Sequence, residues 1–125
     1  MTMADSFFIH GKIIKGSGYG KEIGFPTLNI DRKSFLRLGE KIKFGVYYGT
    51  VTLSRKDYKA GIVIGPLDNK GLPKIEAHLM GLNRDVYGEQ AVFEIKKFIR
   101  KFKKYKNQEK LISQIKKDML FVSKQ

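Results

Sequence analysis

The sequence predicts a mainly β protein, a small antiparallel β-barrel followed by one C-terminal amphipathic α-helix. Turn-forming residues recur at short intervals through most of the 125-residue chain. Segments rich in β-branched and aromatic residues lie between these turns, with no helical pattern separating them. Strands that follow one another in this way pair antiparallel, and five or six of them in a small domain suggest a barrel or sandwich. Only after Asn107 does the apolar spacing become helical.

Five predicted strands follow one another along the chain. The first, residues 7–15, is apolar and β-branched, and Gly11 within it predicts a bend or a bulge. The other four are residues 44–53, 58–65, 74–82 and 91–99.

Two details support these strand assignments. Residues 66–73 predict a turn, because Asp68, Asn69 and Gly71 are turn formers. In the last strand Phe93 and Ile95 share one face, whereas Glu94 and Lys96 share the other.

The end of the chain predicts a helix over about residues 108–122. Asn107 is a suitable N-cap residue, and Glu109 lies in the first turn, where a carboxylate is favourable. The apolar face consists of Leu111, Ile112, Ile115, Met119 and Val122, and the opposite face carries Lys110, Lys116 and Lys117. A single helix must bury such a face, so we expect it to dock across one end or one flank of the barrel.

Length and composition exclude several classes of protein. A chain of 125 residues predicts one domain, with the barrel over about residues 6–100. The absence of cysteine excludes disulfides, a thiol nucleophile and thiolate metal sites, and with only His10 and His78 any metal must have oxygen ligands. No apolar run approaches the roughly 18 residues of a membrane span, and residues 1–6 do not predict a signal peptide. We expect a cytoplasmic monomer with no membrane partner.

The net charge of +13 allows three interpretations. A basic surface binds nucleic acid or membrane, or steers a small polyanion such as a nucleotide into a cleft. Alternatively, lysine simply fills solvent-exposed positions. The segment KKFIRKFKKYK at residues 96–106 interleaves basic with apolar side chains, which is typical of nucleic-acid binders and also of an edge strand that runs into a loop.

A glycine-rich stretch, GSGYGKEIGFPTLN, occupies residues 16–29. Its glycines, Gly16, Gly18, Gly20 and Gly24, can bring bare N–H groups against an anion, which is how phosphates are held. The spacing matches neither a dinucleotide fingerprint nor a Walker loop. A hairpin loop is the alternative interpretation.

Two further features indicate a phosphate-handling site. In an extended Pro26-Thr27-Leu28-Asn29, the Thr27 hydroxyl and the Asn29 amide oxygen point together, which suits a Mg²⁺ ion that arrives with phosphate oxygens and waters. Capping or turn formation is the alternative role. Glu76 shares a strand face with His78, either in solvent or in a cleft where it could accept the proton of a substrate hydroxyl.

Taken in order, these motifs resemble the ATP-dependent riboflavin kinase family, as a stand-alone kinase or as the C-terminal kinase domain of a bifunctional riboflavin kinase/FAD synthetase. The matching segments are GKIIKGSGYGKEIGFPTLNI at 11–30, FGVYYGTV at 44–51, IEAHLM at 75–80, VYGE at 86–89, FIR at 98–100 and LISQIKKDM at 111–119. They reach nearly from end to end. No adenylyltransferase segment with its histidine motif is present, so FAD synthesis is not predicted.

The resemblance implies a six-stranded Greek-key barrel and transfer of the γ-phosphate of ATP to the 5′-hydroxyl of riboflavin, giving FMN and ADP. It implies Glu76 as the base and Mg²⁺ held by Thr27 and Asn29, with no tightly bound organic cofactor. It also implies a nucleotide site of Gly16, Gly18, Gly20, Lys21, Thr27, Leu79, Gly81 and Tyr87, and a flavin site of Arg100, Lys103 and Tyr105.

The flavin segment departs from the family pattern. The family has an acid shortly after the arginine and a phenylalanine later in the loop, and this sequence has Phe102 and Tyr105 there. The competing hypothesis is a non-enzymatic basic β-barrel that binds RNA. It accounts for the charge, but it leaves the glycine-rich stretch, the Pro-Thr-Leu-Asn motif and Glu76 unexplained, so no nucleic-acid partner is expected.

Overall fold

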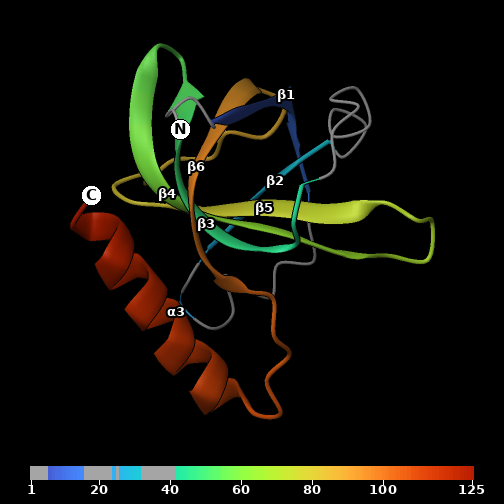
Figure 1. The fold of residues 1–125 in the computed structure, drawn as a ribbon. Helices are drawn as coiled ribbons and strands as arrows, with labels where there is room; N and C mark the ends of the chain where they lie inside the picture. The colour runs from blue at the N-terminus through green and yellow to red at the C-terminus, as the bar shows by residue number, and fades with distance from the viewer. Residues whose placement is uncertain (1–5, 16–23, 25, 32–41) are drawn as a thin grey trace.

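A computed structural model of the chain describes residues 6–15, 24, 26–31 and 42–125. Figure 1 shows strands wrapped around a common interior, with a helix lying alongside them. The elements are β1 (Phe7–Ile14), β2 (Leu28–Ile30), β3 (Gly45–Leu53), β4 (Lys56–Leu67), β5 (Pro73–Leu79), β6 (Gln90–Lys101) and α3 (Gln108–Ser123).

The six strands form a closed barrel in the order β1-β2-β5-β4-β3-β6, and β6 pairs back onto β1. All neighbouring pairs are antiparallel. Strands β3, β4 and β5 pair in sequence, β6 returns to lie beside β3, and β2 lies beside β5, which makes the connections Greek-key. The predicted mainly β barrel with a C-terminal helix is therefore confirmed.

Strand β2 has only three residues and was not among the five strands that the residue pattern predicted. Three residues are too few to show a period of two, so no local signal marks them. Tertiary pairing fixes this strand instead, with Ile30 opposite Ile13 of β1 and Leu28 opposite Ala77 of β5.

The sequence predicts a bend or a bulge at Gly11, and the β1–β6 pair has no bulge there. Strand β1 pairs with β6 in an unbroken register from Phe7 to Lys12, and it then changes partner to β2. Register shifts occur instead where β6 pairs with β3, twice, and where β4 pairs with β5. A glycine in a strand is compatible with a bulge but does not require one, because the register with the neighbouring strand determines whether a residue is left unpaired.

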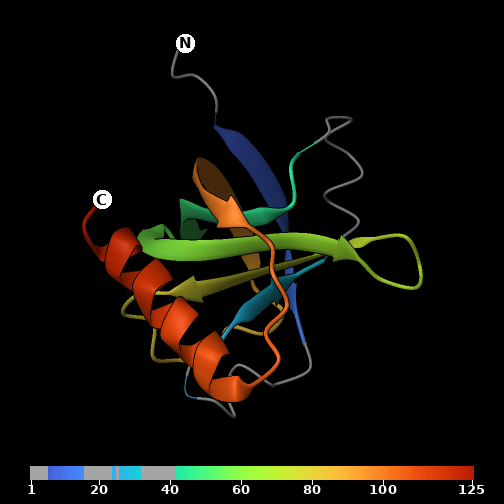
Figure 2. The same ribbon diagram turned by 60° about the horizontal axis from the view of Figure 1, so that its bottom comes forward.

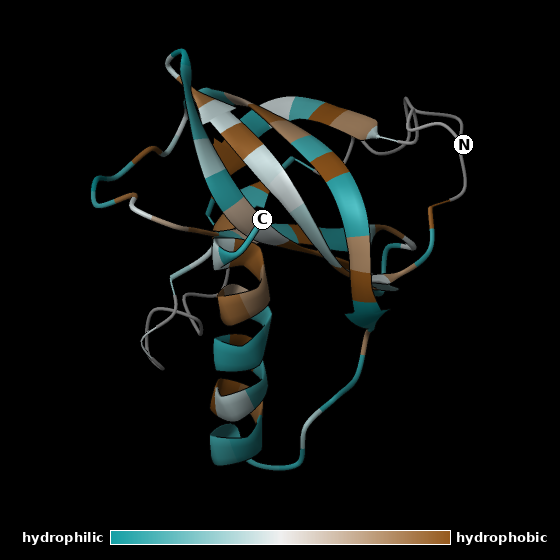
Figure 3. Cartoon of the chain, turned by 60° about the vertical axis from the view of Figure 1, so that its left-hand side comes forward, coloured by the Kyte–Doolittle hydropathy of each residue, from teal (hydrophilic) through white to brown (hydrophobic). Residues whose placement is uncertain are grey.

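The core fills the barrel with side chains from alternate strand positions. Figure 3 shows hydrophobic and hydrophilic residues alternating along the strands. The largest side chains that are under 2% exposed include Phe93, Ile9, Ile62, Ile64, Ile75 and Ile95. The predicted inward face of Phe93 and Ile95 is confirmed.

Helix α3 begins as predicted, because the Asn107 side chain accepts a hydrogen bond from the Lys110 N–H at 2.9 Å. The helix packs against β4 and β3 and covers one flank of the barrel, as Figure 2 shows. Gly61 of β4 permits this close approach, since a Cβ there would lie 3.2 Å from the Met119 sulfur. The docking prediction is confirmed, and the helix buries Ile115 and Val122. In the described residues, no helix is long and apolar enough to span a membrane.

Candidate active site

Two cavities share one residue, Thr27. The helix-side cavity, about 140 Å³, is lined by residues of the barrel, of α3 and of the segment that connects β6 to α3. The loop-side cavity, about 510 Å³, is lined by residues of β1, β2 and β5 and by residues 82–87. Thr27 therefore lies at the border between the two cavities.

Strand pairing brings Asn29 and Glu76 together. They are directly opposed in the β2–β5 pair, and opposed residues of an antiparallel pair project to the same face with Cβ atoms about 4.5–5.5 Å apart. Thr27 precedes Asn29 by two residues and therefore projects toward this face as well. Glu76 and Thr27 both line the helix-side cavity. The predicted metal ligands and the predicted base thus come from different strands to one place.

Glu76 is a half-buried carboxylate at the wall of the helix-side cavity. Burial raises the pKa of Glu76 above its usual value, and the positive charge of Lys74 offsets part of this rise. A raised pKa makes a carboxylate a stronger proton acceptor. The predicted strand face is confirmed, because Ile75 and Ala77 are in the core while Glu76 and His78 line the cavity.

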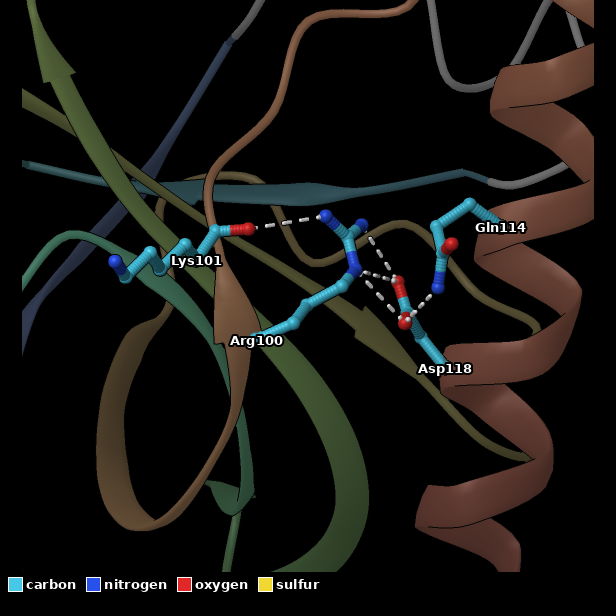
Figure 4. Close-up of polar contacts among 4 residues, drawn as sticks. All are labelled: Arg100, Lys101, Gln114 and Asp118. Atoms are coloured by element: carbon cyan, nitrogen blue, oxygen red, sulfur yellow. Dashed lines mark hydrogen bonds and ion pairs between the residues drawn. The ribbon is translucent and has the colours of Figure 1, made fainter.

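Arg100 lies at the end of β6 in an ion pair with Asp118 of α3, as Figure 4 shows. Its Nε donates to Asp118 Oδ1 at 3.0 Å, and its Nη2 donates to Oδ2 at 2.8 Å. Gln114 Nε2 donates to Oδ1 of the same carboxylate at 3.0 Å. The Arg100 side chain is 22% exposed and the Asp118 side chain 8%. This partly buried ion pair therefore links the barrel to the helix.

The other two residues of the predicted flavin set lie beside this pair. The Tyr105 ring centroid is 5.8 Å from the Arg100 guanidinium carbon and 5.5 Å from Lys103 Nζ. Arg100, Lys103 and Tyr105 all line the helix-side cavity, together with Phe102. The predicted flavin residues are thus grouped at one wall, and an aromatic ring among cations suits a flat, polar aromatic ligand.

The loop-side cavity contains part of the predicted nucleotide set. Leu79 and Tyr87 line it. Tyr87 is 52% exposed, and Lys15 Nζ lies 5.7 Å from the centroid of its ring. Gly81 is not among the lining residues. It has a φ of +86°, a conformation that favours glycine, at the point where the chain leaves β5 toward residues 82–87.

An exposed ion pair borders the same cavity. Arg84 lines the cavity, and its Nη1 donates to Glu89 Oε2 at 2.6 Å. This hydrogen bond lowers the pKa of Glu89 and outweighs a smaller opposite effect of burial. The Ser54 hydroxyl also donates to Glu89 Oε1, at 3.2 Å.

Gly16, Gly18, Gly20 and Lys21 lie outside the described residues. Their predicted contacts with phosphate therefore stay predictions. Among the described residues, the sequence prediction missed Asp118, Gln114 and Arg84. Asp118 had a detectable signal, because it falls between Ile115 and Val122 on the apolar helix face, where a carboxylate needs a partner.

The described residues contain no group of three or more His, Asp or Glu side chains that could hold a metal ion. Of the two predicted ligands, Thr27 lines both cavities, whereas Asn29 is not among the lining residues of either and lies opposite Glu76 in the β2–β5 pair. Their oxygens are the Thr27 hydroxyl and the Asn29 amide oxygen. Two neutral oxygens fit Mg²⁺ when phosphate oxygens and waters complete its octahedron, which is how this ion accompanies nucleotides.

Comparison with known proteins places the whole architecture in one family. Residues 3–125 match the flavokinase family, described as riboflavin kinase. Human riboflavin kinase is 31% identical over 118 residues, which are 90% of this chain and 76% of that protein. An RNA-binding riboflavin kinase from Bacillus subtilis is 34% identical over 119 residues, which are 93% of this chain, and the chain spans only 50% of that protein.

A solved structure agrees with this result. The crystal structure of riboflavin kinase from Trypanosoma brucei superposes with a TM-score of 0.72 at 25% identity, covering 95% of this chain and 76% of the other. The family match, the sequence identity and the structural superposition therefore agree, and the chain belongs to the riboflavin kinase family.

Proposed function

We propose that the chain is a riboflavin kinase, which transfers the γ-phosphate of ATP to the 5′-hydroxyl of riboflavin and releases FMN and ADP. The observation that carries the proposal is the position of Glu76, a carboxylate of raised pKa in a cavity that shares Thr27 with a second cavity. Transfer between two substrates requires two binding sites that meet at the reacting atoms. Riboflavin occupies the helix-side cavity and ATP the loop-side cavity.

Glu76 orients the 5′-hydroxyl and receives its proton. As the bond between the 5′ oxygen and the γ-phosphorus forms, the bond from that phosphorus to the β,γ-bridging oxygen breaks, and its electron pair leaves with ADP. The transition state is loose, so little deprotonation is needed before attack. Glu76 therefore takes the proton late, and its raised pKa favours this transfer.

Thr27 and Asn29 would hold the Mg²⁺ that accompanies the nucleotide, because their oxygens share a strand face with Glu76. When bound, Mg²⁺ neutralises negative charge on the transferring phosphate. By family resemblance, Gly16, Gly18, Gly20 and Lys21 contact the phosphates. Leu79, Gly81 and Tyr87 bind the rest of the nucleotide, in agreement with the lining of the loop-side cavity by Leu79 and Tyr87.

Arg100, Lys103 and Tyr105 bind the flavin ring system. The proposal is supported by their position in the lining of the helix-side cavity and by the apolar side chains that also line it, including Leu111 and Met119 of α3. A planar ligand of mixed polarity suits such a wall, because rings and a guanidinium stack on it while the apolar surface excludes water.

Formation of FMN from riboflavin, ATP and Mg²⁺ tests the proposed function. We expect metal-dependent product in the wild type, and a loss of roughly 10²-fold in Thr27→Ala and Asn29→Ala because charge stabilisation at the phosphate is weakened. Thr50→Ala is the matched control, since this threonine lies on β3 and outside both cavities. A folded wild-type protein that makes no FMN with either ATP or CTP would contradict the assignment.

Riboflavin and ATP are the only partners that the proposal needs, so the basic surface has no nucleic-acid role in it. Binding measured at two salt concentrations separates the alternatives. RNA affinity falls steeply with salt, with a slope set by the number of neutralised phosphates, whereas affinity for uncharged riboflavin changes little. Tight, sequence-dependent RNA binding at moderate salt would revive the RNA-binding hypothesis.

A further inference from the structure

We propose that Asp118 is a positioning residue for the flavin site, which holds the Arg100 guanidinium in one plane at the wall of the helix-side cavity. The proposal rests on the proposed function, because it assumes that riboflavin binds in this cavity. It assigns a task to a helix residue that lies in the apolar stripe of α3 and that was not among the predicted site residues.

The contacts between the two side chains fix both position and plane. Two nitrogens of Arg100, Nε and Nη2, donate to the two oxygens of Asp118, with shortest distances of 3.0 and 2.8 Å. Paired contacts of this kind define the orientation of a guanidinium, whereas one contact would leave it free to rotate. Figure 4 shows the Asp118 carboxylate between Arg100 on one side and Gln114 on the other.

Gln114 holds the carboxylate itself in place. Its Nε2 donates to Asp118 Oδ1 at 3.0 Å from one helical turn away. Asp118 therefore has partners from β6 and from its own helix, and its side chain is only 8% exposed. Because Asp118 is held in place, it restricts the rotamers of the long Arg100 side chain before any ligand binds. Arg100 therefore loses less conformational entropy when the ligand binds.

The ion pair leaves part of the guanidinium available to a ligand. Arg100 has five N–H groups, and Nη1 makes only a longer contact, 3.3 Å, to the Lys101 carbonyl. Within the described part of the chain, two of the five N–H groups have no acceptor. Because Asp118 offsets the charge, the guanidinium presents these donors to an uncharged ligand at a lower desolvation cost than a lone cation.

Packing alone does not account for an acid at position 118. It lies between Ile115 and Val122, which are buried at 7% and 0% exposure. A buried ion pair is often no more stabilising than apolar residues of similar size. The pair is therefore better explained by the geometry that it gives Arg100 than by its contribution to folding.

The decisive measurement is the riboflavin dissociation constant, followed by the quenching of flavin fluorescence in the absence of ATP. Asp118→Asn keeps the size of the side chain and removes the charge, and we expect riboflavin to bind about tenfold to fiftyfold more weakly. The KM for ATP should change less than about twofold. Glu109→Gln is the matched control, because it removes the same charge from an exposed position of the same helix.

Double substitutions separate positioning from folding. If Asp118 acts through Arg100, then Asp118→Asn in an Arg100→Met background weakens riboflavin binding by less than about threefold further. Arg100→Met with Asp118→Leu restores an apolar contact between strand and helix, so it should unfold no earlier than Asp118→Asn while it still binds riboflavin poorly. This result would show that stability and flavin affinity are set separately.

Three outcomes are decisive. Equal effects of Asp118→Asn in the wild-type and Arg100→Met backgrounds would overturn the positioning role. Unchanged riboflavin affinity in Asp118→Asn, with wild-type FMN formation intact, would overturn the positioning role and leave the proposed function standing. A wild type that neither binds riboflavin nor forms FMN would overturn both.

Discussion

A carboxylate in the helix-side cavity and one beside the loop-side cavity have pKa values that are shifted in opposite directions. Glu76, half-buried in the helix-side cavity, has a pKa that burial raises. Glu89, beside the loop-side cavity, has a pKa that the Arg84 hydrogen bond lowers. The same chemical group thus binds its proton more tightly where burial dominates and less tightly where it accepts a hydrogen bond from an arginine. Burial and the charged partner, and not the residue type, determine the direction in which the pKa of each carboxylate is shifted.

The ion pairs of the two regions differ in the same way. The Arg100–Asp118 pair has side-chain exposures of 22% and 8%, whereas the Arg84–Glu89 pair has 43% and 31%. Exposed pairs contribute little because water and salt screen them. Removal of one partner should therefore cost more stability in the Arg100–Asp118 pair than in the Arg84–Glu89 pair.

The largest expected effect concerns the two carboxylates themselves. Glu76→Gln should lose roughly 10² or more in kcat, because the 5′-hydroxyl loses its proton acceptor, while riboflavin and ATP still bind. Glu89→Gln should retain kcat within about threefold, since that carboxylate is tied to Arg84 and not to the reacting hydroxyl. Steady-state kinetics on both variants checks this. Near-normal turnover in Glu76→Gln would remove Glu76 from the mechanism.

A smaller effect separates the two binding sites. Tyr105→Ala should raise the KM for riboflavin about tenfold with little change for ATP, because its ring lines the helix-side cavity. Tyr87→Ala should raise the KM for ATP about threefold to tenfold with little change for riboflavin, because its half-exposed ring lines the loop-side cavity. Measuring the KM for riboflavin and the KM for ATP in both variants tests whether each substitution affects only one substrate. If either variant raises both constants equally, the two cavities do not divide the substrates as proposed.

The smallest effect is on stability, and its sign differs between the two carboxylates. The raised pKa of Glu76 means that the folded state binds its proton more tightly than the unfolded state. The free energy of unfolding therefore falls as the pH rises from the usual pKa of a glutamate to the raised pKa of Glu76. Above the raised pKa the carboxylate is ionised and the full loss of stability is present. Glu76→Gln should unfold at a higher temperature than wild type at pH 7, with a difference that vanishes in acid.

Glu89 provides the opposite case and the control. Because the pKa of Glu89 is lowered, its ionised form stabilises the folded state at every pH above the usual pKa of a glutamate. This contribution is lost as the pH falls through the lowered pKa. Glu89→Gln should unfold slightly earlier than wild type at pH 7 and at the same temperature in acid. Thermal unfolding of the three proteins at neutral and acidic pH measures both signs. Shifts of the same sign in the two variants would contradict the contrast between the cavities.

Local patterns of residues were sufficient for much of the fold. The alternation around Phe93, the turn formers Asp68 and Gly71, and the Asn107 cap depend only on neighbours in the chain, so the strands, the hairpin and the helix start could be predicted. Of the two alternatives predicted at Gly11, a bend or a bulge, the bulge is absent, because a glycine permits irregular pairing without causing it. The short strand β2 could not be predicted from periodicity, since its three residues are held by β1 and β5.

By itself, the sequence determined the residue types of the site, the alternation that directs Glu76 away from the core, and the apolar stripe that makes α3 dock. Only the tertiary structure decided which of these residues meet. The β2–β5 register sets Asn29 opposite Glu76, and the docking of α3 buries Asp118 against Arg100. The physical reason is distance along the chain: periodicity and capping are local, whereas pKa shifts and ion pairs depend on contacts between segments that only the closed barrel and its helix bring together.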